Sequence, residues 1–310
     1  IISIEKPFLD VNFAVNGNSD QESVGYPGQE AEGSVEIKNN FDTKITDVEI
    51  VASFSGNAFD PENIIVPNGF YDPIRQEITW NSETSDQLAS IDPGDRKELE
   101  FNFKPISLSS STIKNPEILI NVSIKGRQPS QGNQFVEIDD YLKKKVKYSS
   151  SLQITGNALY NSGPIVNSGP LPPLPGTKTT YTIVWNVVNT TSRVTNAKAR
   201  ATLPSYVDWT NKVSPTNESV SFNPSTREVV WDIGNLDQYV GLSSSPKQVY
   251  FQVALNASGS QSGSSPRLLL DTVITGKDSF TGQNLSKTLA PITTRLNLDS
   301  NYNAENDTVK

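Results

Sequence analysis

Apolar and polar side chains alternate along many short stretches of the chain, and this alternation predicts β-strands. The clearest case is 31–39, where Val35 and Ile37 occupy one face and Glu36 and Lys38 the other. Successive side chains of a strand point to opposite sides of its sheet, so a half-buried strand needs a period of two. Such stretches, separated by turn residues, occur at 7–15, 31–39, 45–54, 62–66, 76–80, 97–103, 117–125, 134–138, 151–155, 179–188, 194–203, 218–222, 227–233, 247–255 and 267–276.

The sequence predicts an all-β chain, because no helical stripe exceeds two turns. Alternation is imperfect over 45–54, which indicates a bulge or a change of face there. The polar stretch 16–23 is expected to be a loop.

The chain also repeats itself at an offset of roughly 148 to 151 residues. A repeat of this length corresponds to one whole domain per copy. Aligning the turns places Asn40 on Asn189 and Asp47 on Asn196, and Trp80 falls on Trp231. The matching blocks are 27–54 with 175–203, EITW (77–80) with EVVW (228–231), KELEFNFK (97–104) with KQVYFQVA (247–254), and ILINVSIKG (118–126) with LLLDTVITG (268–276).

Seven or more short strands per 150 residues, with turn signals between them, are typical of an immunoglobulin-like antiparallel β-sandwich. We therefore expect two tandem sandwiches related by internal duplication, 1–148 and 149–298. Little linker is expected around 146–151. Residues 299–310 are expected to form a frayed polar tail or a link to further domains.

The tryptophans suggest where the two cores lie. Trp80 and Trp231 occupy equivalent strand positions, so each is expected to anchor a core, with carbohydrate stacking as the alternative. Trp185 and Trp209 have no counterpart in the first repeat, and either could form a surface contact.

Residues 161–176 contain NSGP twice and then LPPLPG. Proline-rich sequence favours extended backbone. The segment is therefore expected to be a stiffened surface loop, with a proline-motif ligand as the alternative.

Composition excludes several classes of function. The net charge is −8 and the pI is near 4.8, which argues against binding nucleic acid or an anionic membrane. The chain has no Cys, His or Met, so it cannot form a Ser-His-Asp triad, a thiolate nucleophile or an imidazole metal site. No apolar run approaches the roughly 18 residues of a membrane span.

Chemistry based on oxygen ligands stays open. Carboxylate catalysis would need a convergent pair of acids, and the nearest candidates are Asp92 with Asp95 and Asp139 with Asp140, all in polar contexts. We predict no catalytic residue and no cofactor. Calcium held by Asp and Asn oxygens is an alternative for which no ligand can be named, so the metal site is unknown.

Lysines raise two further alternatives. A lysine isopeptide crosslink would need a buried lysine, and Lys38 is on the polar face of its strand. The run Lys143, Lys144, Lys145 and Lys147 is expected to be a solvated strand edge, with polyanion binding as the alternative.

Several blocks of the second half resemble a conserved β-sandwich repeat of unknown function found in large bacterial cell-surface proteins. These blocks include SGPLPPLPG (168–176), TTYTIVWNVVNTT (179–191), ATLPSYVDWT (201–210) and GSSPRLLLDTVITGKDSFTG (263–282). The first half departs from the pattern at Phe54 and Ser55, where the second half has Leu203 and Pro204. The resemblance implies an extracellular, cell-surface setting with a structural or adhesive role, and it supplies no catalytic residues.

We therefore predict a non-catalytic extracellular structural protein, a rigid spacer or an assembly subunit of a bacterial surface layer or filament. Its expected partners are copies of itself or other surface proteins. The alternative is an adhesin that recognises carbohydrate or a protein through its loops, which exposed Tyr206, Trp209 and Tyr239 at one tip would favour.

Overall fold

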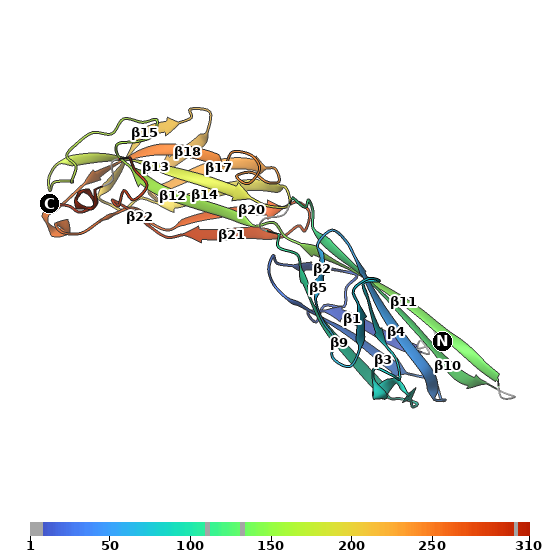
Figure 1. Cartoon of the computed structure of the whole chain (residues 1–310). Coiled ribbons are helices and arrows are strands. Elements are labelled where there is room, and N and C mark those ends of the chain that lie inside the picture. Colours follow the sequence, from blue (N-terminus) through green and yellow to red (C-terminus); the bar gives the residue numbers. More distant parts are fainter. Residues whose placement is uncertain (1–8, 109–111, 131–133, 301–302) are drawn as a thin grey trace, which may run out of the picture. The chain divides into compact units, whose positions relative to one another are not determined.

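The computed structural model describes residues 9–108, 112–130, 134–300 and 303–310. The chain forms two compact units, Ile1–Ser149 and Ser150–Lys310, and each is a β-sandwich with its own core (Figure 1). In the described residues the only helices are the short 3-10 turns η1 (Asp86–Leu88), η2 (Gly259–Gln261) and η3 (Ala304–Asp307). No helix in this part of the chain is long and apolar enough to span a membrane.

Unit 1 packs a sheet of order β1-β3-β9-β5 against one of order β2-β11-β10-β4-β7-β6, with β8 beside β4. All pairs are antiparallel except β2 with β11. The strands are β1 (Leu9–Val15), β2 (Glu22–Gly25), β3 (Ala31–Asn39), β4 (Ile45–Ser55), β5 (Phe59–Ile65), β6 (Phe70–Asp72), β7 (Glu77–Trp80), β8 (Ser90–Ile91), β9 (Arg96–Pro105), β10 (Glu117–Ser130) and β11 (Gln134–Tyr148).

Unit 2 packs a sheet of order β12-β13-β18-β15 against one of order β16-β17-β14-β20-β21, with the short pair β19-β22 beside them. Its strands are β12 (Leu152–Leu159), β13 (Lys178–Asn189), β14 (Val194–Thr202), β15 (Val207–Ser214), β16 (Ser219–Asn223), β17 (Glu228–Leu236), β18 (Lys247–Asn256), β19 (Arg267–Leu269), β20 (Thr272–Asp278), β21 (Asn284–Leu289) and β22 (Ile292–Thr293).

The two units share one topology, as an internal duplication requires. β1, β3, β9 and β5 correspond to β12, β13, β18 and β15, and β6, β7, β4, β10 and β11 correspond to β16, β17, β14, β20 and β21. Local backbone agrees: Asp47 and Asn196 have φ of 51° and 55°, beside register shifts in β4 and β14. The bulge expected in 45–54 is therefore present, and it recurs in the second unit.

The structure corrects the alignment of the repeat by one residue. Leu9 faces Asn39 across β1 and β3, and Leu152 faces Asn189 across β12 and β13, so Asn39 is the counterpart of Asn189. The turn that follows is one residue longer in unit 1. Pairing across the strands fixes which residues are equivalent, whereas a sequence alignment through turns of unequal length does not.

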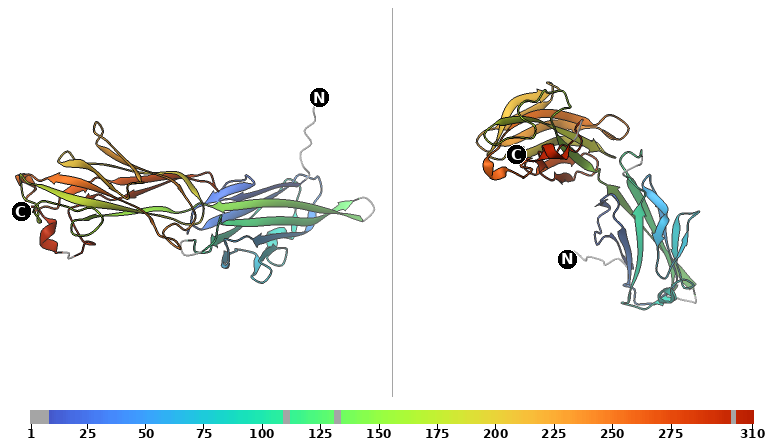
Figure 2. Two further views of the ribbon diagram at one scale, coloured as in Figure 1. Left: turned by 90° about the horizontal axis from the view of Figure 1, so that it is seen from above. Right: turned by 60° about the vertical axis from the view of Figure 1, so that its left-hand side comes forward.

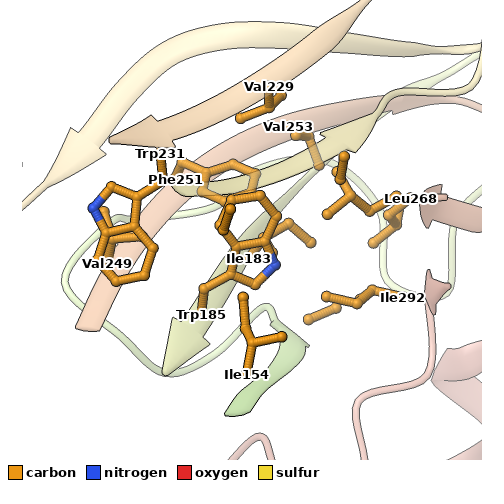
Figure 3. Packing of buried hydrophobic residues seen from close by; sticks show 14 of the residues in the cluster. Ile154, Ile183, Trp185, Val229, Trp231, Val249, Phe251, Val253, Leu268 and Ile292 are labelled. Carbon is orange, nitrogen blue, oxygen red and sulfur yellow. The ribbon is translucent and has the colours of Figure 1, made fainter. Parts of the chain in front are cut away.

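The expected core anchors are confirmed, because Trp80 and Trp231 are fully buried. The expectation that Trp185 forms a surface contact is wrong. Trp185 is fully buried, with its ring centroid 4.9 Å from that of Phe251 and 6.5 Å from that of Trp231 (Figure 3). Its strand β13 lies in the middle of its sheet, where every inward side chain is covered.

Several strands were not predicted, and others have different bounds. β2 begins at the end of the expected polar loop, β11 runs ten residues past 138 to Tyr148, and 267–276 is divided between β19 and β20. β6, β8, β15, β21 and β22 were also missed. Most of these are short or mainly exposed strands, in which a period of two is weak or absent.

The expectation of a frayed tail is wrong for the part of 299–310 that the structure describes. The Asp299 carboxylate accepts hydrogen bonds from the N–H groups of Tyr160, Asn161 and Ser162 at 3.0, 2.7 and 2.8 Å. Val309 is buried and exchanges backbone hydrogen bonds with the segment 263–264. These polar residues therefore complete unit 2.

Candidate functional site

The aspartates named from the sequence as candidate acid pairs lie in a turn and on a strand of unit 1. Asp92 and Asp95 lie in one turn, where Asp92 is 3.1 Å from Lys44 Nζ and Asp95 is 3.6 Å from Lys97 Nζ. Asp139 and Asp140 are consecutive residues of β11, so their side chains point to opposite faces of the sheet. The Asp140 carboxylate accepts the N–H of Tyr141 at 2.7 Å.

Four surface depressions in the described part of the chain are open and mainly polar. One in unit 1, of about 580 Å³, is lined by the acidic residues Glu83, Asp86, Glu98 and Glu100 among others. Over the described residues, no three His, Cys, Asp or Glu side chains are grouped so as to hold a metal ion. Calcium binding remains an untested alternative.

The lysine run corrects one expectation, because Lys144 is buried rather than solvated. Its ammonium donates to the carbonyl oxygens of Asn18 and Asp20, both at 2.5 Å, and lies 5.7 Å from the ring centroid of Phe13. Burial lowers the pKa of Lys144, although Asp20 opposes this. The lysine fastens the loop before β2, and its contacts are carbonyl oxygens rather than a carboxylic acid.

A cluster of interacting side chains around Glu218 was not predicted from the sequence. The Glu218 carboxylate lies 2.5 Å from Lys247 Nζ and accepts the indole N–H of Trp231 at 2.9 Å. In unit 1 the counterpart of Glu218 is Pro67, and the indole N–H of Trp80 has no partner among the described residues. The cluster links Glu218, just before β16, to the middle of β17 and to the first residue of β18, and no sequence motif indicates it.

The aromatic residues that would have favoured an adhesin do not form an exposed cluster. Tyr239 is buried. Trp209 stacks on Phe222 with ring centroids 5.8 Å apart and packs, as Tyr206 does, against the core of unit 2.

The positions of the chain ends within each unit are informative. In unit 1, β1 begins opposite Asn39, the last residue of β3. Tyr148, the last residue of β11, donates its N–H to Pro116 just before β10 begins. The start of β10 lies beside the last residue of β4, which is at the end of the sandwich far from Asn39. The described chain therefore starts at one end of unit 1 and leaves at the other.

Unit 2 has the same arrangement. β12 begins opposite Asn189, the last residue of β13. Lys310 donates its N–H to Pro173, which is close to the first residue of β13. The twelve residues of β13 lie between these points, a length of about 40 Å at the usual rise of a strand.

Each residue of the connection between the units, Ser149 to Ser151, donates a hydrogen bond from its backbone N–H. Ser149 donates its N–H to Gly25 of unit 1 at 3.2 Å. Ser150 donates to the carboxylate of Asp278 at 2.7 Å, and Ser151 donates to the hydroxyl of Thr190 at 2.8 Å, both in unit 2. Every residue of the connection is thus held by one fold or the other.

No protein-family model matches the sequence, and no curated protein matches it. The chain is similar in structure to a C-terminal fragment of the major pilin of Streptococcus agalactiae (8% identity, 91% of each chain, TM-score 0.28). It is also similar to a type I cohesin–dockerin complex from Clostridium thermocellum (14% identity, 48% of this chain and 97% of that one, TM-score 0.26). A third similar structure is a human PapD-like domain (11% identity, 48% of this chain and 90% of that one, TM-score 0.21). These identities and TM-scores carry no conclusion about function, and membership of the bacterial surface repeat family remains a prediction.

Proposed function

We propose that the chain is a non-catalytic structural segment of a bacterial cell-surface protein, a spacer or assembly subunit that carries load through two sandwiches in series. The observation that carries this proposal is that in each unit the chain enters at one end of the sandwich and leaves at the other. A spacer needs this arrangement, because each fold then contributes its full length to the reach of the protein.

The strand ladders suit this role. Force applied between opposite ends of a unit acts along the strands, and the hydrogen bonds of an antiparallel ladder are perpendicular to them. Many bonds must then break together, whereas force applied at one end breaks them one after another. Because the three serines of the connection are each hydrogen-bonded to a unit, no unbound chain would have to extend before force passes from one fold to the next.

Composition supports an exposed, inert role. The sequence contains no Cys, His or Met, so it offers no thiol or thioether for oxidation.

The surface location rests on the sequence resemblance. Antibody labelling of intact source cells tests it, and label that appears only after lysis would contradict it.

Single-molecule force spectroscopy tests the load-bearing role. Because the chain has no Cys, handles can be attached at introduced cysteines. Gln153→Cys with Lys310→Cys pulls unit 2 from opposite ends, and Gln153→Cys with Gln283→Cys pulls it from one end. We expect a clearly higher unfolding force for the first pair. Equal forces for the two pairs would rule out a fold arranged to carry load.

Pulling the whole chain from its two ends should show two unfolding steps. Each should lengthen the chain by roughly 450 to 520 Å, which is the extended length of one unit less its folded length. A single step of the summed length would contradict two folds loaded in series.

A further inference from the structure

The outer edge of β11 is open along most of its length. On its inner side β11 pairs with β10 from Gln134 to Tyr148, but on its outer side β2 reaches only Lys145–Tyr148. No other strand in the described part of the chain pairs with this edge. The hairpin of β10 and β11 also extends beyond the rest of the unit 1 sandwich (Figures 1 and 2).

The register shows which backbone groups lie on that edge. Lys145 donates its N–H outward to Gln21, so the odd-numbered residues of β11 direct their N–H and C=O groups away from β10. Tyr141 is one of them, and its N–H is bonded only to the neighbouring Asp140 carboxylate. A further strand can therefore pair with the outward peptide groups of residues 139 and 143, and with that of Tyr141 once its N–H exchanges the Asp140 carboxylate for a main-chain carbonyl.

The side chains along this edge have a charge pattern that is complementary to itself. Asp139, Tyr141 and Lys143 share one exposed face, and Tyr141 is 52% exposed. When a strand meets its own copy in antiparallel fashion around Tyr141, each Asp139 lies opposite a Lys143. Opposite charges directly across a ladder are stabilising.

We propose that a second copy of this chain binds here, with its β11 antiparallel to the first and Tyr141 opposite Tyr141 on a two-fold axis. The interface is isologous, since the same edge serves both copies. It forms about six main-chain hydrogen bonds, two at the Tyr141 pair and two at each Asp139–Lys143 pair. The inference rests on the proposed function, because it names the partner of an assembly subunit.

The neighbouring registers are disfavoured for identifiable reasons. Moving the copies two residues one way places Asp140 opposite Asp140, and like charges directly across a ladder are destabilising. Moving them two residues the other way places Asp139 opposite Lys145. That pair would need the outward N–H of Lys145, which already donates to the carbonyl of Gln21. The Tyr141 register brings no like charges together.

Lysines on a strand edge usually prevent pairing. On the open part of β11, however, the acidic residue Asp139 precedes the basic residue Lys143 along the exposed face. Because the two signs are segregated, an antiparallel copy meets attraction at both ends. A parallel copy or an unrelated strand does not.

Charge exchange in the full chain tests the proposal by analytical ultracentrifugation. We expect the wild type to dimerise, and Asp139→Lys and Lys143→Asp each to weaken dimerisation about 30-fold, because each places like charges opposite at two symmetric positions. The double variant restores the pairs and should return to within about threefold of wild type. Lys277→Asp changes the net charge as Lys143→Asp does, at an exposed position of β20, and should leave dimerisation unchanged.

A monomeric wild type would overturn the proposal. Failure of the double variant to recover would also overturn it, as would an equal effect of Lys277→Asp. Circular dichroism and thermal unfolding verify that each variant is folded.

Disulfide crosslinking tests the register independently. Across a hydrogen-bonded pair the Cα atoms are about 5.5 Å apart, within disulfide range. Tyr141→Cys should therefore crosslink the copies on oxidation. Lys143→Cys should not, because symmetry mates at that position lie about 14 Å apart. Equal crosslinking of the two variants would overturn the register.

The two proposals can fail separately. A chain that stays monomeric but resists force along its length would leave the spacer role intact and remove the pairing. A chain that dimerises through β11 but unfolds at the same force from either pair of handles would do the reverse.

Discussion

A buried asparagine occupies the same position in each unit and closes the turn between two strands. Asn39 donates its side-chain N–H groups to the carbonyls of Thr43 and Ile91, both at 2.9 Å. Asn189 donates to the carbonyls of Ser192 and Asp237 at 2.7 and 2.9 Å. Both are fully buried. In each unit, one amide at the end of β3 or β13 thus binds the turn that leads to the opposite sheet and a second segment beside that sheet.

Replacing Asn189 by Ala should destabilise unit 2 by about 3 kcal/mol, because two buried carbonyls lose their donor. Chemical denaturation followed by tryptophan emission measures this, since Trp185, Trp209 and Trp231 lie in unit 2. The exposed Asn284→Ala serves as the control and should cost less than about 0.5 kcal/mol. A cost for Asn189→Ala no larger than that of the control would show that the turn does not depend on the amide.

Asp299 gives unit 2 a dependence on pH. Burial would raise the pKa of Asp299, but hydrogen bonds from Asn161, Ser162 and Tyr160 outweigh it and hold the pKa below its usual value. Because the folded pKa is lowered, the stabilisation is complete above the unfolded pKa of about 3.9 and is lost as the pH falls through the folded pKa.

Asp299→Asn should therefore lower the melting temperature of unit 2 at neutral pH, at a cost of about 2 kcal/mol. It should also reduce the further loss of stability below about pH 4. Thermal unfolding across a pH series checks both effects. Asp271→Asn, at an exposed position, is the control. An unchanged acid slope in Asp299→Asn would assign the acid sensitivity to other carboxylates.

At the scale of elements, the proline-rich segment 161–176 lies on the outer face of the sheet that contains β13 and β18. Gln252, a buried residue, donates to the carbonyl of Val166 and to the side-chain oxygen of Asn167, both at 3.0 Å. Thr182 donates to the same oxygen of Asn167 at 3.2 Å. The expectation of a surface loop holds, and polar groups on the outer face of the sheet bind it there.

Gln252→Ala should loosen this segment while leaving the core unchanged. The loss of about 1.4 kcal/mol from two hydrogen bonds should speed proteolysis within 161–176 about tenfold. Limited proteolysis with mass spectrometry measures the rate. Gln248→Ala alters the same face of β18, and Gln248 bonds Asn186 instead of the segment. Equal cleavage rates in the two variants would show that the segment is held by other contacts.

At the scale of the whole molecule, the two cores share no residue. The cluster in unit 1 lies within residues 13–148 and the cluster in unit 2 within 152–309. Each can therefore be weakened separately.

Ile37→Ala, which creates a cavity at a fully buried position of β3, should cost unit 1 about 3 kcal/mol. The unfolding transition reported by the tryptophans of unit 2 should not move. Denaturation monitored by tryptophan emission and by circular dichroism separates the two transitions. A shift of both by the same amount would mean that the units unfold as one.

Sequence alone determined the all-β class and most of the strands that line the cores. Val35 and Ile37 alternate with charged residues on a strand with one covered face, and periodicity reports that directly. The duplication, the bulge near Asp47 and the burial of Trp80 and Trp231 followed from local pattern and the internal repeat.

Only the tertiary structure decided features that depend on partners distant in the sequence. Trp185 is buried because β13 lies within its sheet, and Lys144 is buried because the loop at residues 18–20 folds over it. Asp299 is bound because residues about 140 positions earlier offer their N–H groups. The open edge of β11 is likewise set by where β2 stops pairing. Periodicity records which way a side chain points, whereas only the assembled sheets decide what covers it.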